Sequence, residues 1–239
     1  FTHGVQSGDA SASGGMVWTR VDRPSRILLE VSTTESFADA RRVAQLTALP
    51  DSDMAVKCLI DGVAPDQRVF YRFTATDLSD VNSTGQPVTG QFRAAPTQKR
   101  DIRFGWSGDT AGQGFGIPEE GMRTYAAMSG HELDFFIHSG DTIYADGPIK
   151  AEQEHAGGVW KNVVVIPEVE KVAETLDEFR GRYKYNQMDR FVQSFCSEVP
   201  FYYQWDDHEV TNNWSPGKDL SGDDRYTEKS IALLSARAG

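Results

Sequence analysis

The chain has 239 residues, of which 39% are hydrophobic and 25% charged, and its formal net charge is −11. This composition is ordinary for a globular protein of one large or two modest domains. The acidic balance argues against binding through a basic surface to nucleic acid or to an anionic membrane. No apolar run is long enough to span a bilayer, and two cysteines do not make a disulfide framework.

The N-terminal region is expected to be all-β. Short stretches rich in β-branched and aromatic residues alternate there with turn signals such as Asp61-Gly62. The stretches are 16–18, 26–32, 54–60 and 69–75. Short strands at regular spacing without a strong helix are typical of a β-sandwich. Residues 59–65 followed by 70–73 resemble part of a fibronectin-III-like domain, so we predict such a sandwich over 1–95.

A polar, proline-containing stretch at 94–99 is typical of a linker. We therefore predict two domains, 1–95 and 96–239. Beyond the linker, strands alternate with helices, which indicates an α/β fold. Residues 147–175 fit this alternation least well, and the strand-like run 163–166 within them predicts an insertion near the functional site.

Three helices are expected in the second domain. They cover 118–129, a long stretch from Thr175 through Phe195, and 226–238. The long helix opens with Thr175, and Glu178 follows three residues later, which is the pattern of a capping box. Its aromatic residues are expected to pack in the core rather than to bind substrate.

Three apolar stretches of the second domain each end in acidic residues. Residues 102–107 lead into Asp109, residues 133–138 into Asp141, and residues 201–205 into Asp206, Asp207 and His208. Such runs are expected to be buried strands, and open α/β sheets place ligand sites at the carboxyl ends of strands. Three such ends in order predict carboxylates converging on one sheet edge. Clustered carboxylates need a compensating charge, so we predict a metal centre there.

Each of these residues has a plainer interpretation when taken alone. An aspartate after a glycine, such as Asp109, is usually part of a turn, and Tyr144 alone would be a packed aromatic. Asp206 is expected to form a salt bridge or cap a turn, and His138 to be a hydrogen-bonded core histidine. The loop 112–116 fits a plain turn and close backbone approach to a ligand equally well. The metal interpretation rests on the combined set, because aspartate oxygens suit hard cations and a tyrosine phenolate suits Fe³⁺.

Several separated motifs of the chain stand at 4–9, 17–20, 106–114, 138–147 and 205–214. In this order they resemble the PhoD-like alkaline phosphatase D family of the calcineurin-like and purple-acid-type metallophosphatase superfamily. The resemblance extends over nearly the whole chain. It implies an α/β (α+β) metallophosphatase-type sandwich, of which only the first half is present, preceded by the all-β fibronectin-III-like domain.

The resemblance also implies roles for individual residues. The metal ligands that it implies are Asp109, Asp141, Tyr144 and Asp207. Asp141 would bridge two metals, and His208 would contact the substrate, where it can stabilise phosphate charge or protonate the leaving oxygen. Asn212 and Asn213 match an Asn-Asn pair of the family that would orient phosphate or reach a metal, and Asn213 is predicted to act in catalysis.

The implied cofactors are two or more hard metal ions, Fe³⁺ with Ca²⁺, with Mg²⁺, Mn²⁺ or Zn²⁺ as alternatives. They would neutralise the phosphoryl oxygens and activate a hydroxide that attacks phosphorus. Some family members have a cysteine near the first strand, where this chain has Ser107, Gly108 and Asp109, so an iron thiolate bond is not expected. The superfamily also uses late histidines, yet none follows His208. We therefore expect the chain to be the N-terminal portion of a longer protein.

The predicted function is metal-dependent hydrolysis of phosphate esters by an alkaline phosphatase or phosphodiesterase. A phospholipase-D-like diesterase is one alternative, and a non-catalytic, metal-stabilised secreted binding protein is another if the chain is complete. The expected partner is a phosphate mono- or diester, and the chain is expected to be a monomer without a transmembrane segment. The resemblance implies export, so a periplasmic or secreted location is expected.

Overall fold

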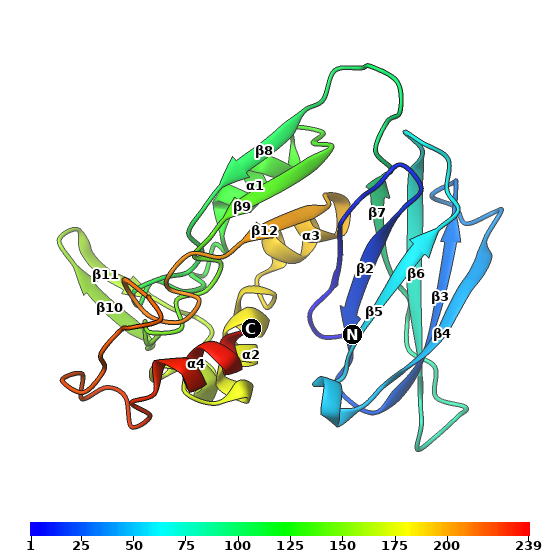
Figure 1. The fold of residues 1–239 in the computed structure, drawn as a ribbon. Coiled ribbons are helices and arrows are strands. Elements are labelled where there is room, and N and C mark those ends of the chain that lie inside the picture. The colour runs from blue at the N-terminus through cyan, green and yellow to red at the C-terminus, as the bar shows by residue number, and fades with distance from the viewer. The chain divides into compact units, whose positions relative to one another are not determined.

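The computed structural model describes residues 1–239. The chain divides into two compact units. The first unit consists of Phe1–Gly105, Thr124–Phe136 and Val192–Tyr202, and the second of Trp106–Arg123, Ile137–Phe191 and Tyr203–Gly239. Each unit therefore combines segments that are distant in sequence. Figure 1 labels their helices and strands.

The strands form a four-stranded sheet, a six-stranded sheet and a small hairpin. The four-stranded antiparallel sheet has the order β4-β3-β6-β7, with β3 Ser25–Ser32, β4 Arg41–Ala48, β6 Arg68–Asp77 and β7 Val88–Arg93. The six-stranded sheet has the order β5-β2-β1-β12-β9-β8, with β1 Val5–Gly8, β2 Gly14–Arg20, β5 Ala55–Asp61, β8 Phe104–Ser107, β9 Phe135–Ser139 and β12 Phe201–Gln204. β1 and β2 pair antiparallel, whereas β1 and β12 pair parallel, with Gly8 opposite Phe201. The six-stranded sheet is therefore mixed.

Side chains from both sheets fill one core in the first unit. Ile27 and Leu29 of β3 and Val17 and Ile60 of the neighbouring sheet are all fully buried in the same hydrophobic cluster. Alternate residues of a strand point to opposite faces, so the period-two pattern identifies the buried face. The strands predicted at 16–18, 26–32, 54–60 and 69–75 are confirmed as β2, β3, β5 and β6.

Strands β1, β4 and β7 are additional to those predicted. Half of the residues of β4 are polar, and most of its side chains are exposed or half-buried. β1 is only four residues long, and β7 contains Gly90. A short, polar or glycine-containing strand lacks the apolar alternation that marks a strand in sequence.

Two of the predicted helices begin later than expected. The helix predicted over 118–129 is α1, Arg123–Ser129, because residues 118–121 form a turn in which Gly121 N donates to Pro118 O at 2.9 Å. The helix predicted over 226–238 is α4, Ile231–Ala238, which begins after the N-cap Ser230. The Ser230 side chain accepts a hydrogen bond from Leu233 N, so the cap fixes the first turn.

The predicted long helix is in fact two helices, α2 Leu176–Asn186 and α3 Arg190–Glu198. The capping box of Thr175 and Glu178 at the start of α2 is confirmed. The chain breaks before α3 because Asp189 accepts hydrogen bonds from Phe191 N at 2.8 Å and from Met122 N at 2.9 Å. In the first unit, Phe195 packs against Phe136 and Phe201 with ring centroids 5.4 and 5.5 Å away, which places it in the core as expected.

The strand predicted at 163–166 is wrong. The strands of this insertion are β10, Glu152–His155, and β11, Gly158–Lys161, which pair as an antiparallel hairpin. Val164 and Ile166 instead pack against a small core with Ile149, and the chain then enters the 3₁₀ helix η2, Pro167–Val169. A second 3₁₀ helix, η1, covers Pro50–Ser52. The apolar run in this insertion therefore marks core packing rather than strand pairing.

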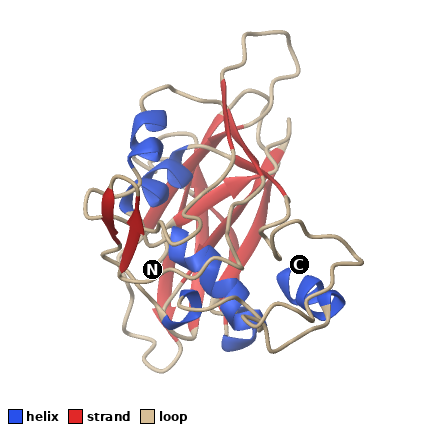
Figure 2. Cartoon of the chain, turned by 90° about the vertical axis from the view of Figure 1, so that its left-hand side faces the viewer, coloured by secondary structure: helices blue, strands red, loops and turns tan.

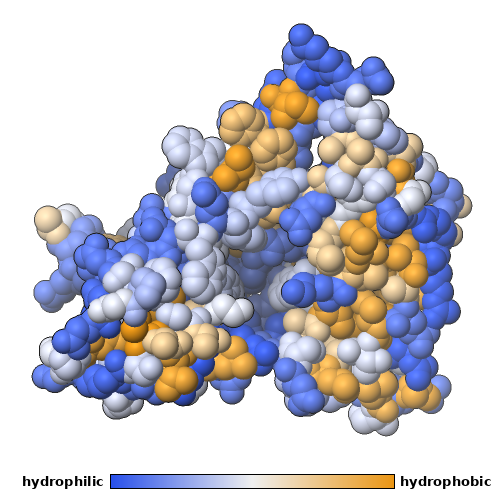
Figure 3. Space-filling view, viewed as in Figure 1, coloured by the Kyte–Doolittle hydropathy of each residue, from blue (hydrophilic) through white to orange (hydrophobic).

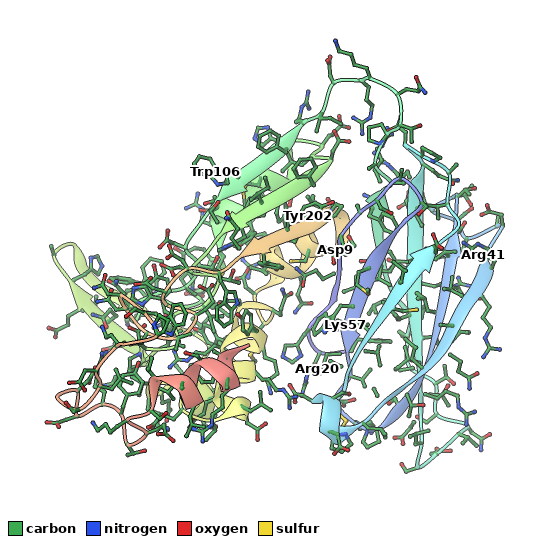
Figure 4. All side chains as sticks on the ribbon, viewed as in Figure 1. Asp9, Arg20, Arg41, Lys57, Trp106 and Tyr202 are labelled. Atoms are coloured by element: carbon green, nitrogen blue, oxygen red, sulfur yellow. The ribbon has the colours of Figure 1, made fainter.

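Several large apolar side chains remain at the surface. Phe104 is 54% exposed and stacks on Phe135 with the ring centroids 5.4 Å apart. Trp106 is 71% exposed and projects from β8 (Figure 4). Hydrophobic residues also gather at the surface around β5 (Figure 3), where Leu59 is 55% exposed. No helix combines the length and apolarity needed to cross a bilayer.

Glu174 connects the start of α2 to the segment that leads into α4, and all of these lie in the second unit. Its Oε1 accepts hydrogen bonds from Thr227 N at 2.6 Å, Thr227 Oγ1 at 2.8 Å and Glu228 N at 2.6 Å. Its Oε2 accepts from Lys171 Nζ at 3.1 Å. Burial acts to raise the pKa of Glu174, but these hydrogen bonds outweigh it and lower the pKa from 4.5 to about 2. The carboxylate is therefore favoured in the folded state.

The Glu174 contacts predict a specific loss of stability in acid. A carboxyl whose pKa is lower when folded contributes stability above its unfolded pKa, here 4.5, and loses that contribution as the pH falls towards about 2. We expect Glu174→Gln to unfold at lower urea concentration than wild type at pH 7 and to approach wild type by pH 3. Urea midpoints at both pH values test this. A constant difference between the two proteins would contradict it, and the exposed Asp177→Asn of α2 serves as the control.

Candidate functional site

Three loops of the second unit start shortly after β8, β9 and β12 and lie together. Asp109 N donates to Gly140 O at 3.2 Å, and Thr110 N donates to Asp141 O at 2.9 Å. The third loop joins through His208 N, which donates to Asp141 Oδ1 at 3.2 Å. Long loops, drawn in tan in Figure 2, connect the strands and helices. The predicted convergence of the three strand ends is present in this structure.

The backbone at two of these turns is left-handed. Asp109 has φ 60° and Asp141 has φ 52°, a region that aspartate enters more readily than most residues. Gly140 has φ 93°, and a Cβ added there would lie 2.4 Å from the Cβ of Asp206. The second and third loops therefore touch too closely for any side chain at Gly140. This contact brings the chain around Asp206 against the Asp141 turn.

Five of the predicted site residues form one connected group. Asp141, Asp207 and His208 each offer a ligand atom, and these atoms lie within 4.8 Å of one another. Tyr144 is 8% exposed, and its ring centroid lies 4.4 Å from that of His208. Asp109 lies outside the three-residue cluster but accepts a hydrogen bond from Tyr144 Oη. The phenol thus connects the first loop to the other two.

The surroundings of Asp141 and Tyr144 disfavour negative charge. Burial raises the pKa of Asp141 to about 6, and the charges of Glu209 and Asp207 raise it further. The hydrogen bond from His208 N acts in the opposite direction but is outweighed. Burial also raises the pKa of the Tyr144 phenol, as do its hydrogen bond to Asp109 and the charge of Asp141. A nearby cation would reverse both effects.

The side chain of His208 is held by Asp146, which is 5% exposed. His208 Nδ1 lies 2.7 Å from Asp146 Oδ1, and Asp146 Oδ2 accepts from Asn212 N at 2.8 Å. Burial acts to lower the pKa of His208, but the hydrogen bond and charge of Asp146 and the charges of Asp141 and Asp207 outweigh it, so the pKa is raised. Asp146 therefore fixes the ring and favours its protonated form.

In the phosphate ester hydrolysis that the sequence predicts, Asp146→Asn is expected to lower kcat by about 10- to 100-fold, the usual effect of removing a residue that orients a site histidine. The amide keeps the size of the side chain but loses the charge that stabilises a protonated His208. Steady-state kinetics of the purified variant measure the effect. Asp177→Asn, at an exposed position of α2, is the control and should retain wild-type kcat. A wild-type kcat in Asp146→Asn would show that His208 needs no such support.

Glu209 is fully buried and connects the second and third loops. Its Oε1 accepts from Thr142 N at 2.6 Å, and its Oε2 accepts from Asp141 N at 3.2 Å and Asp206 N at 2.9 Å. Asn186 of α2 adds support, because its Nδ2 donates to Thr142 O at 2.6 Å. These positioning residues were missed in the sequence, where Glu209 only completes the Asp-His-Glu motif. The apolar Val210 directly after Glu209 was the available signal that this acidic residue is buried.

The remaining predicted residues have the following positions. His138 is fully buried, with Nε2 2.8 Å from Thr110 Oγ1 and Nδ1 3.1 Å from Thr142 Oγ1, as expected for a hydrogen-bonded core histidine. Asp206 is exposed beside the contact at Gly140. Asn212 and Asn213 are exposed, and Asn213 N donates to an oxygen of Asp207. Asn213 thus reaches the cluster through its backbone.

The donor chemistry of this group fits hard cations. The oxygens of Asp109, Asp141, Asp207 and Tyr144 come from three loops that the hydrogen bonds hold together. Carboxylate and phenolate oxygens are ligands for hard metal ions, and an imidazole such as His208 suits several transition metals. The raised pKa values of Asp141 and Tyr144 point the same way, because both groups lie where negative charge lacks a partner. These residues are therefore compatible with a metal centre.

Family models match nearly the whole chain. A model described as PhoD-like phosphatase matches residues 104–239, and one described as PhoD-like phosphatase, N-terminal domain, matches residues 1–96. The chain is 28% identical over 228 residues to alkaline phosphatase D of Bacillus subtilis (strain 168). The aligned region covers 90% of this chain and 36% of that protein. The chain thus spans well under half of the length of this curated relative.

Two solved structures share the fold. The structure of PhoD matches with a TM-score of 0.73 and 24% identity, over 99% of this chain and 43% of that chain. A purple acid phosphatase from yellow lupin (Lupinus luteus) seeds matches with a TM-score of 0.52 and 12% identity, over 98% of this chain and 40% of that chain. At these identities the likeness concerns the fold, a mixed α/β sheet arrangement.

Proposed function

Because the chain belongs to the PhoD-like phosphatase family, we propose that it contributes to an enzyme that hydrolyses phosphate esters with bound metal ions. The observation that carries the proposal is the cluster of Asp141, Asp207 and His208, whose ligand atoms lie within 4.8 Å of one another. A structural role alone would not require carboxylates in a partly buried site that raises the pKa of one of them. The family match agrees with this chemistry.

Asp109, Asp141, Tyr144 and Asp207 are the residues that would hold the metals, and we propose Asp141 as the ligand that two ions would share. Hard ions such as Fe³⁺ with Ca²⁺, or alternatively Mg²⁺, Mn²⁺ or Zn²⁺, would supply positive charge to phosphoryl oxygens and make water acidic enough to act as the nucleophile. Glu209 holds two of the loops that carry these ligands in register. Tyr144 and Asp109 extend the group to the first loop.

His208 is proposed to donate a proton to the leaving oxygen of the ester. Its Nδ1 is engaged by Asp146, so Nε2 is left to face the reacting group. Asp146 raises the pKa of the ring, which favours the acid form that such a step needs. Asn213 is proposed to help orient phosphate, supported by its position on the carboxylate of Asp207.

Hydrolysis of p-nitrophenyl phosphate and of its bis ester, with and without chelator, tests the proposal. We expect turnover that is lost on chelation and restored by added metal ions. A preference for the monoester indicates a phosphatase, and a preference for the bis ester indicates a phosphodiesterase, the class that includes phospholipase-D-like activity. Turnover that resists chelation would contradict the metal mechanism. No turnover with any of these ions would favour a binding protein.

We also propose a domain division into 1–95 and 96–239, with the first a fibronectin-III-like β-sandwich. The shared core of the strands of its two sheets supports this division. A monomeric state and a periplasmic or secreted location are retained as proposals that follow from the family resemblance. Size-exclusion chromatography with light scattering, and fractionation of cells that express the natural gene, test them.

A further inference from the structure

A cavity of about 490 Å³ opens beside the metal-binding cluster in the second unit. His208 belongs both to the cluster and to the wall of this cavity. The remaining wall includes Lys150, Arg225, Gln113 and Gln153. A phosphoryl group held at the cluster would therefore extend its ester substituent past His208 and into the cavity. The cavity is the natural place for the leaving group that His208 protonates.

Lys150 brings a positive charge to the cavity, and the one carboxylate among the lining residues, that of Asp146, is engaged by His208 and by Asn212 N. Its side chain is exposed, and none of the ion pairs of the chain involves it. Its backbone is nevertheless fixed, because Asn162 Nδ2 donates to Lys150 O at 2.6 Å. Asn162 Nδ2 also donates to Gly114 O at 2.8 Å, so the same buried residue holds the loop that carries Gln113. The ammonium group is thus exposed while its attachment point is held.

Arg225 contributes a second positive charge in a fixed orientation. Its Nη2 lies 2.7 Å from Asp223 Oδ2, and its Nε donates to Asp223 Oδ1 at 2.9 Å. Its Nη1 donates to Asp146 O at 3.0 Å, beside the residue that holds His208. Asp223 neutralises part of the charge of Arg225. It also fixes the guanidinium before a ligand arrives, so that binding a ligand costs less side-chain entropy. Two cations therefore line one cavity of a chain whose net charge is −11.

We propose that this cavity receives the leaving group of the ester and that Lys150 and Arg225 select leaving groups that carry a second negative charge. The preferred substrates are phosphate esters whose alcohol part bears a further anionic group. This inference rests on the proposed phosphoesterase function and narrows its substrate class. A simple neutral leaving group fills the space but leaves Lys150 without a partner, whereas an anionic one forms charge-assisted hydrogen bonds with both cations.

The test compares two esters of nearly the same shape whose leaving groups differ in charge, 4-carboxyphenyl phosphate and 4-carbamoylphenyl phosphate. We expect kcat/KM to favour the carboxylate about fivefold to tenfold, a modest effect because Lys150 is exposed. Lys150→Gln should reduce this preference, and Lys150→Glu should reverse it. Lys161→Gln serves as the matched control, because Lys161 lies on the same hairpin region but outside the cavity and should leave the preference unchanged.

A binding measurement separates the cavity from the chemistry. Calorimetry with 4-carboxybenzyl phosphonate and 4-carbamoylbenzyl phosphonate, which are not hydrolysed, should show tighter binding of the carboxylate and loss of the difference in Lys150→Gln. Charge-selective binding without ester turnover would support the cavity and overturn the proposed hydrolysis. Turnover of both esters at equal kcat/KM, unchanged by Lys150→Glu, would overturn the cavity and leave hydrolysis standing. Neither binding nor turnover would overturn both.

Discussion

Asp141→Asn is expected to lower kcat for phosphate ester hydrolysis by about 1,000-fold or more while the protein remains folded. Asp141 contributes a carboxylate oxygen to the cluster with Asp207 and His208, and it also accepts the hydrogen bond from His208 N. Removing a residue that only orients such a site costs about 10- to 100-fold, so removal of Asp141, the proposed shared metal ligand, should cost more. Asparagine has nearly the same shape and tolerates the left-handed φ of 52° at this position.

Three measurements make the Asp141→Asn result decisive. Steady-state kinetics give kcat, elemental analysis gives the metal content, and thermal unfolding gives the stability. We expect kcat and metal content to fall together, with only a small change in stability. Asp206→Asn is the control, because Asp206 is a neighbouring but exposed aspartate on the third loop. A variant that keeps its metal and its kcat would refute the assignment of Asp141.

Glu209→Ala is expected to lower the free energy of unfolding by at least about 3 kcal/mol. The buried carboxylate accepts hydrogen bonds from three partly buried backbone N–H groups, and a hydrogen bond to a charged group contributes about 1.5–3 kcal/mol. Alanine would remove all three hydrogen bonds and create a cavity between the loops. Because the loops carry Asp141 and Asp207, we also expect kcat to fall, even in the fraction that remains folded.

Urea unfolding of Glu209→Ala and Glu209→Gln tests the role of Glu209. Glutamine keeps the volume and one oxygen acceptor, so its loss of stability should be smaller. The surface variant Glu154→Gln, at an exposed hairpin position, provides a baseline for an ordinary carboxylate. Equal stability of Glu209→Ala and wild type would mean that the three N–H groups find other partners, and the proposed link between the loops would be wrong.

The part of the site that lies along a single stretch of chain could be predicted from the sequence. Asp109 and Asp141 each follow an apolar run and a glycine, so their place at a strand end follows from local pattern alone. His208 stands beside Asp207 and needs no folding to be associated with it. The partners Asp146 and Glu209 could not be assigned, because their hydrogen bonds join residues more than sixty positions apart.

The errors in the helices have a similar origin. Apolar spacing runs through 175–195 without interruption, yet Asp189 ends one helix and begins another by bonding to Met122 as well as Phe191. The local signal therefore favoured one helix, whereas a contact from a distant segment required two. Residues 163–166 were taken for a strand because an apolar run suits a strand and a small core equally well. Only the packing of Val164 and Ile166 beside Ile149 decides between them.

The parallel pairing of β1 with β12 sets the order in which the first unit can fold. Gly8 lies opposite Phe201, and Tyr202 Oη donates to Ala10 O at 2.9 Å beside it (Figure 4). The hairpin of β1 and β2 forms locally, but its other edge stays open until a loop of nearly two hundred residues has closed. Closing such a loop is entropically costly and slows folding. During synthesis the first strands therefore keep one edge unpaired until residues nearly two hundred positions later have been made.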